Sequence, residues 1–128
     1  DLAATGVRRS DAVTTFLGGI WDAIGPNGTI ITPAFVRQGF RFGHVPFSTP
    51  ETPSYTGAFS KLLLAQPGAY RSTHPTHSFA GLGARAKKIL NYHPADGACF
   101  EPPRMMIDHD ALFAAIGCVY SSPGVGPF

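Results

Sequence analysis

The chain has 128 residues, enough for one domain with its own hydrophobic core. It is 44% hydrophobic and 14% charged, a globular composition that excludes an intrinsically disordered chain. The net charge of +2 comes without a lysine or arginine block, so nucleic acid is not an expected partner. No apolar run reaches the roughly 20 residues of a membrane span. The two cysteines, Cys99 and Cys118, are expected as reduced thiols in a cytoplasmic protein.

The first half of the chain predicts a helix, a strand and a long loop. Over residues 11–24, apolar side chains recur at the spacing of one buried helix face, with Ser10 suited to the N-cap and Gly25 to the end. Residues 29–36 are rich in β-branched side chains and predict a buried strand. Residues 37–55 hold three prolines and two glycines, which indicates an irregular loop of the kind that often carries function.

The second half predicts three helices and two strands. Helices are expected over residues 56–66, 84–92 and 102–109, the last beginning with prolines where a helix tolerates them. A short strand is expected at 69–72, and the nearly continuous apolar run at 112–121 is typical of a fully buried strand. Helices that alternate with buried strands predict an α/β fold: a layered, mostly parallel sheet with flanking helices.

The segment "YRSTHPTHSFAGLG", residues 70–83, concentrates the chemically useful side chains. His74 and His77 are zinc-ligand types, but a zinc site needs three or four ligands. The further candidates are His93, Cys99 and His109. Their spacing matches no standard zinc pattern, so no metal is expected. Serines beside these histidines do not make a serine hydrolase either, because the chain has no G-x-S-x-G motif.

A ligand-binding loop is the third interpretation of this segment. Arg71 is a donor suited to phosphate or carboxylate, and residues 78–86 are expected to start a helix whose free N–H groups face the same pocket. A purely structural interpretation stands beside it. There, His77 and Ser78 cap that helix and His74 packs beneath the loop. The residues alone leave both interpretations open.

Three segments in register resemble one family. They are "GPNGTIITPAF" at Gly25–Phe35, "TPSYTG" at Thr52–Gly57 and "RSTHPTHSFAGLG" at Arg71–Gly83. Their order and spacing resemble the antibiotic N-acetyltransferase family, best known for the aminoglycoside 3-N-acetyltransferases. The resemblance implies that family's α/β fold. It also implies transfer of an acetyl group from acetyl-CoA to a small-molecule amine such as an aminoglycoside, by direct attack with general-base assistance.

The resemblance also suggests which residues form the cofactor site. Arg71 and Ser72 are expected to contact acetyl-CoA. Thr32 joins them, because ligands of α/β sheets favour the carboxyl ends of strands.

The amine substrate is expected to meet a second set of residues. This set is Phe35, Tyr55, His74 and Ser78. His77 and His74 are expected to support catalysis, for example by orienting a catalytic group. The catalytic residues themselves stay unassigned.

Residues 1–128 are expected to form a single, partial domain of this family, lacking its N-terminal and C-terminal parts. An upstream H-S-S-L-like segment of the coenzyme site and a downstream T-x-x-H-x-x-E-like segment with the expected catalytic pair have no counterpart in the chain. Enzymatic activity of the 128 residues is therefore left open. The alternative is a catalytically inactive fragment that folds as a binding or oligomeric scaffold, where a homo-oligomer covers the exposed sheet edge.

Overall fold

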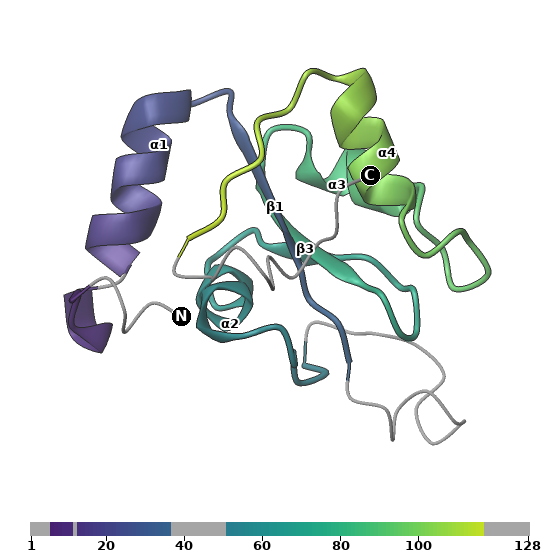
Figure 1. The fold of residues 1–128 in the computed structure, drawn as a ribbon, viewed down its shortest axis with the longest axis horizontal. Helices are drawn as coiled ribbons and strands as arrows, with labels where there is room; N and C mark the ends of the chain where they lie inside the picture. The colour runs from purple at the N-terminus through teal and green to yellow at the C-terminus, as the bar shows by residue number, and fades with distance from the viewer. Residues whose placement is uncertain (1–5, 12, 37–50, 117–128) are drawn as a thin grey trace.

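The structure, a computed structural model, describes residues 6–11, 13–36 and 51–116 (Figure 1). Its sheet has three strands, β1 (Thr29–Pro33), β2 (Tyr70–Arg71) and β3 (Phe79–Gly83), in the order β1-β3-β2. Both pairings are antiparallel. The predicted mostly parallel sheet is therefore wrong for the described chain, although strands and helices do combine as expected. No helix in these described ranges has the length and apolarity that a membrane span requires.

The central strand β3 accounts for the difference in topology. Its residues were expected to start a helix, yet they pair with β1 on one side and with β2 on the other. Residues 72–78 join β2 to β3, and this connection is shorter than the crossover of about a dozen residues that parallel strands require. Alanine and leucine favour helices locally, but pairing on both edges of the strand outweighs that propensity.

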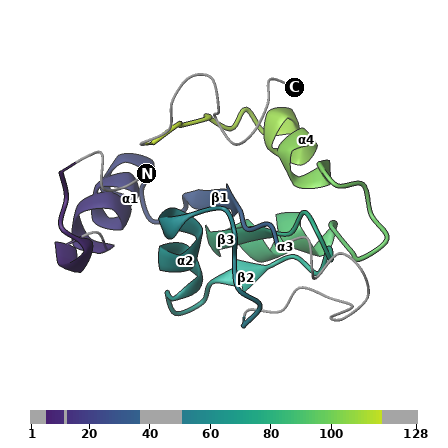
Figure 2. The same ribbon diagram turned by 60° about the horizontal axis from the view of Figure 1, so that its bottom comes forward.

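The expected strand at 112–121 is also wrong where it can be checked. Residues 112–116 form no strand, and the Leu112 side chain is 98% exposed. Figure 2 shows this segment, coloured yellow-green, running well away from the sheet, which among the described residues consists of β1, β3 and β2. Residues 117–121, with Cys118, lie outside the described part of the chain. So does most of the predicted 37–55 loop, whereas Cys99 is described and is a free thiol.

The helices predicted over residues 11–24, 56–66, 84–92 and 102–109 are confirmed in position. The first comprises a 3-10 turn η2 (Arg9–Asp11), a π-helix η3 (Val13–Gly18) and the α-helix α1 (Gly19–Ile24). Gly25 ends it with a φ of 73°, as a C-terminal glycine should. The Ser10 hydroxyl instead bonds the neighbouring Asp11 carboxylate. The remaining helices are α2 (Ala58–Leu64), α3 (Ala86–Asn91) and α4 (Glu101–Asp108).

Helices cover both faces of the sheet. One face carries Ile30 and Ala80, which pack with Leu17 of η3 and Leu63 of α2 in the hydrophobic core. The opposite face carries Gly81, where an added Cβ would lie 3.0 Å from side-chain atoms of α3. Successive residues of a strand point to opposite faces of the sheet. Adjacent residues at a strand end therefore contact different helices.

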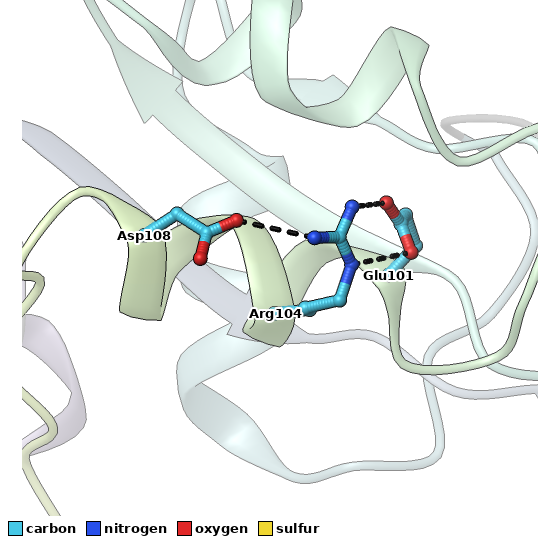
Figure 3. Close-up of polar contacts among 3 residues, drawn as sticks. All are labelled: Glu101, Arg104 and Asp108. Carbon is cyan, nitrogen blue, oxygen red and sulfur yellow. Dashed lines mark hydrogen bonds and ion pairs between the residues drawn. The ribbon is translucent and has the colours of Figure 1, made fainter.

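Helix α4 packs through its first turn. Pro102 and Pro103 are both buried there, at positions where their missing N–H groups cost nothing. On its outer side, Arg104 pairs with Glu101 one turn before and with Asp108 one turn after (Figure 3). The hydrogen bond from Arg104 holds the pKa of Glu101 below its usual value. These pairs are exposed and contribute to helix α4 locally rather than to the core.

Gly83 at the end of β3 is expected to tolerate no side chain. Its φ is +112°, and an added Cβ would lie 2.3 Å from the Gly28 carbonyl oxygen and 2.9 Å from the Trp21 ring. We expect Gly83→Ala to lower the free energy of unfolding by about 3 kcal/mol, as backbone strain and overpacking add. Urea unfolding followed by circular dichroism measures it.

Gly19→Ala is the matched control for this substitution. Gly19 lies in the helical run with nothing within 4 Å of the added Cβ, so alanine should stabilise the protein by about 0.5–1 kcal/mol. Equal effects of the two substitutions would contradict the close approach at Gly83.

Candidate active-site wall

The turn between β2 and β3 carries most of the polar side chains singled out in the sequence. We call residues 71–78 the 71–78 turn. It lies beside the chain that follows β1, because the Ala34 N–H donates to the Ser78 carbonyl at 2.8 Å. The Val36 N–H likewise donates to the Thr76 carbonyl at 3.2 Å. The end of β1 and the 71–78 turn therefore form one continuous wall.

Arg71 anchors this wall from inside. Its Nε donates to Ser78 Oγ at 3.0 Å, and its two terminal nitrogens donate to the carbonyl oxygens of Thr52 and Ala34. Ser78 Oγ donates in turn to the same Ala34 carbonyl at 2.7 Å. The guanidinium thus joins the three segments that carry the family resemblance, since Ala34, Thr52 and Ser78 belong to one segment each.

Arg71 is 3% exposed, and burial lowers its pKa to about 10. It remains a cation at neutral pH, and its hydrogen bonds to carbonyl oxygens are the charge-assisted kind. The same hydrogen bonds make the predicted contact of Arg71 with acetyl-CoA less favourable. A guanidinium held on these protein oxygens fits a scaffold role and could reach a ligand only by giving some of them up.

Ser72 points to the opposite face of the sheet from Arg71. Its Oγ accepts the Phe79 N–H at 2.9 Å and lies 2.9 Å from Nδ1 of His93. Both Ser72 and His93 are fully buried. Thr32 shares the face of Arg71, because both are paired with Ala80 in the sheet. The sheet therefore separates Ser72 from the other two residues of the predicted cofactor set.

His74 closes the turn upon itself. Its Nδ1 accepts the backbone N–H of His77 at 3.0 Å and that of Thr76 at 3.3 Å. The ring of His74 also stacks on that of His93, with centroids 4.7 Å apart and planes 9° apart. An acceptor at Nδ1 places the ring proton of neutral His74 on Nε2.

His77 and Phe35 form the aromatic part of the wall. The His77 ring lies edge-on to Phe35 at 4.9 Å and to Phe100 at 5.4 Å. Its Nδ1 is 2.8 Å from the Thr76 hydroxyl. Tyr55 joins this region through its backbone, whose N–H donates to the Phe35 carbonyl at 2.7 Å, while its side chain is 67% exposed. The predicted substrate residues thus gather at one end of β1.

The buried histidines are neutral at physiological pH. Burial is the main cause that lowers the pKa of His93 to about 4, and the neighbouring His74 adds to it. Burial likewise lowers the pKa of His74, with His77 as the second cause. The carbonyls of Ala98 and Gly97 oppose these shifts only in part.

His93 is the residue that sequence reasoning missed. It was considered only as a candidate zinc ligand, yet it packs directly against Ser72 and His74 of the 71–78 turn. Its place directly after helix α3 was visible in the sequence, but no pattern there reveals that it meets Ser72. Among the described residues, no group of three or more histidines, cysteines or carboxylates is arranged to hold a metal ion.

The chain is similar to proteins of a known family. The family model described as aminoglycoside 3-N-acetyltransferase matches residues 3–118. Aminoglycoside N(3)-acetyltransferase IX of Micromonospora chalcea is 28% identical over 99 residues, which cover 64% of this chain and 35% of that protein. Aminoglycoside N(3)-acetyltransferase VII of Streptomyces paromomycinus is 29% identical over a stretch of the same length, 34% of that protein. The chain therefore spans about a third of the length of these curated relatives.

A solved structure supports the fold. AAC-VIa bound to sisomicin superposes with a TM-score of 0.70 at 25% identity, over 87% of this chain and 48% of that one. The family predicted from the three sequence motifs is therefore confirmed. The predicted parallel sheet is not, because the sheet of the described chain is antiparallel.

Replacing Arg71 should test the anchor of the wall. Arg71→Met keeps much of the side-chain length but leaves the buried carbonyls of Ala34 and Thr52 without this donor. We expect the free energy of unfolding to fall by about 3 kcal/mol. Arg85→Met is the control, because Arg85 is exposed and its loss should change stability by no more than about 0.5 kcal/mol. A loss below about 1 kcal/mol for Arg71→Met would contradict the anchoring role.

Stability should fall in mild acid because of His93. Its pKa is about 4 in the folded chain against 6.5 ordinarily, so between these values the unfolded state binds more protons. The stabilising contribution is complete above pH 6.5, and acidification to pH 4 should remove about 3 kcal/mol. Urea unfolding at a series of pH values measures the slope of the free energy of unfolding against pH. His93→Phe should flatten it and His109→Phe should not; an unchanged slope in His93→Phe would contradict the assignment.

Proposed function

Because its match covers residues 3–118, the chain belongs to the aminoglycoside 3-N-acetyltransferase family, and we propose that it serves acetyl-CoA-dependent N-acetylation of an amine such as an aminoglycoside. The observation that carries this proposal is the Arg71 anchor. It draws the three family-like segments into one wall at the end of β1. We further propose that residues 1–128 form one part of a larger domain of this family.

The reaction is a direct acyl transfer. The amine nitrogen of the substrate attacks the thioester carbonyl carbon of acetyl-CoA, the new C–N bond forms, and the C–S bond breaks as coenzyme A leaves. The amine gives up a proton to a base, and the leaving sulfur takes one up as a thiol. Neighbouring donors stabilise the oxyanion that forms in between.

The wall supplies support for this chemistry rather than a complete set of catalytic groups. His77 is only half-buried and carries aromatic neighbours on two sides, so we assign it the supporting role of orienting the amine or its base. His74 fits general-base work less well, because its Nδ1 is engaged by two backbone N–H groups. Its role in the proposal is to keep the turn closed.

Phe35 and Tyr55 complete the proposed substrate side of the wall. Phe35 contacts His77, and the exposed Tyr55 ring extends from a backbone that is bonded to Phe35. Aromatic faces of this kind suit the ring faces of a sugar and attract ammonium groups. Arg71, Ser72 and Ser78 lie behind these side chains, so in the proposal they shape the site from within. Thr32 remains the candidate for direct contact with the coenzyme, since it is half-buried at the end of β1.

A second candidate function is a scaffold without catalytic activity. The observation in its favour is that two of the three residues predicted to bind acetyl-CoA are buried and hydrogen-bonded to protein atoms. A chain that covers about a third of its curated relatives could then supply a structural wall, with the coenzyme held elsewhere in the full assembly.

Calorimetric titration with acetyl-CoA decides between the two. The proposed function predicts micromolar binding by the wild-type chain, weakened at least about tenfold by Thr32→Ala, a loss of about 1.4 kcal/mol, because Thr32 is the candidate for direct contact with the coenzyme. His109→Ala is the control, because His109 follows helix α4 outside the wall, and it should bind like wild type. A folded wild-type chain that shows no binding would favour the scaffold. Mass spectrometry of a mixture with an aminoglycoside then tests for the acetylated product.

A further inference from the structure

His93 lies directly beneath the 71–78 turn and contacts it at two points. One is the hydrogen-bond distance of 2.9 Å between its Nδ1 and the Ser72 hydroxyl. The other is the parallel stack on His74, at 4.7 Å between ring centroids. The ring is fully buried, with an edge contact to Phe79 at 5.8 Å. Ser72 is near the start of the turn and His74 at its middle, so His93 holds both parts.

Each contact leads to a different set of backbone hydrogen bonds. Ser72 Oγ accepts the N–H of Phe79, the first residue of β3, and so closes the base of the turn. His74 Nδ1 accepts the N–H groups of Thr76 and His77, and so shapes its tip. A single residue that follows α3 thus supports both the base and the tip.

We propose that His93 is a positioning residue that fixes the 71–78 turn from behind, through Ser72 at its base and through His74 at its tip, and that it does so only as a neutral ring. The functional consequence of this inference rests on the proposed function, because the turn is then the wall of the acetyl-transfer site. The positioning itself needs no ligand and can be measured in the chain alone.

The neutral form matters because of the surroundings of His93. A cation stacked face to face with another buried imidazole lacks solvent, and protonation of His74 at Nδ1 would remove the acceptor for two backbone N–H groups. The titratable groups around the pair are His77, which disfavours a charge on His93, and Glu101 at the start of α4, which favours one. Nε2 of His93 is buried without a hydrogen-bond partner of good geometry in the described part of the chain. The Ala98 carbonyl favours a proton on the ring, but it does not offset the cost of burying the charge.

Two substitutions separate the two contacts. His93→Phe keeps a ring against His74 but removes the nitrogen that faces Ser72. His93→Asn places a polar group near the position of Nδ1 but removes the ring that stacks on His74. Amide hydrogen exchange measures how well the backbone N–H groups of the turn are protected in both variants. The Ala65 amide at the end of α2 is the internal reference, because it is bonded to the Lys61 carbonyl outside the site.

The expected result is a crossover. In His93→Phe, exchange of the Phe79 amide should rise about tenfold, the effect of losing about 1.4 kcal/mol of local support, while Thr76 and His77 change less. In His93→Asn, the Thr76 and His77 amides should be the accelerated ones and Phe79 should stay protected. Ala65 should be unchanged in both, and His109→Phe should match wild type throughout. Uniform acceleration in both variants, or none, would overturn the proposal, because mere packing predicts no crossover.

A wild-type measurement covers the case in which a variant does not fold. As the pH falls from 7 to 4, the NMR signals of the His93 ring should titrate well below pH 6.5. Exchange at Phe79 and His77, corrected for its intrinsic pH dependence, should rise over the same range and ahead of Ala65. A His93 ring that titrates near 6.5 while Phe79 stays protected would overturn the inference.

Titration of His93→Phe with acetyl-CoA tests whether the position of the turn matters for binding. If the wild-type chain binds acetyl-CoA, the variant should bind about tenfold more weakly, and His93→Asn should recover part of the loss if the Ser72 contact dominates. If the wild-type chain does not bind, the proposed function fails, while the exchange crossover still decides whether His93 positions the turn.

Discussion

The buried guanidinium of Arg71 is the constraint on which the wall depends. It is the common donor to Ala34 after β1, to Thr52 before α2 and to Ser78 at the start of β3. These segments are far apart in sequence. Ala34 and Thr52 each turn a backbone carbonyl toward the guanidinium, and Ser78 turns its side-chain hydroxyl toward it. A buried carbonyl without a donor costs about 1–3 kcal/mol, so one planar cation with several N–H groups resolves several such costs at once. Lysine has no equivalent geometry, which explains why this position suits arginine in particular.

The alternation of a β-strand gives the neighbouring residue an independent task. Arg71 points to the face that carries the core with α2, so Ser72 must point to the face covered by α3. There it meets His93, and through His93 it is connected to His74 and the tip of the turn. Two adjacent residues therefore fix the same turn from opposite sides of the sheet. This division explains why the turn is held in place although it contains few apolar side chains.

The sequence predicted the four helices and strands β1 and β2, but it did not predict β3 or the antiparallel topology. Helices α2, α3 and α4 follow from the spacing of their apolar residues, from Pro67–Gly68 after α2 and from the prolines that begin α4. Strand β3 was missed because "FAGLG" contains the good helix formers alanine and leucine. In the structure its glycines allow close packing, since Gly81 admits Ala86 and Leu90 of α3, and Gly83 admits Trp21 and the Gly28 backbone. The partners of Arg71 and His93 could not be predicted either, because they depend on the register of β3 between two strands that sequence periodicity does not specify.

The hydrogen bonds of the wall indicate which of its positions depend on the side chain and which depend only on the backbone. Ala34 and Thr52 accept the Arg71 hydrogen bonds through backbone carbonyls, so these interactions do not depend on their side chains. Arg71 and Ser78 contribute side-chain atoms, and so do Ser72, His74 and His93, which makes these five positions the chemically restricted ones. Tyr55 is exposed, and Phe35 and His77 are half-buried and contact each other edge to face. In the proposed function, substrate choice would rest on these three residues, while the five restricted positions preserve the shape of the wall. Substrate choice and stability would then depend on different residues of the same wall.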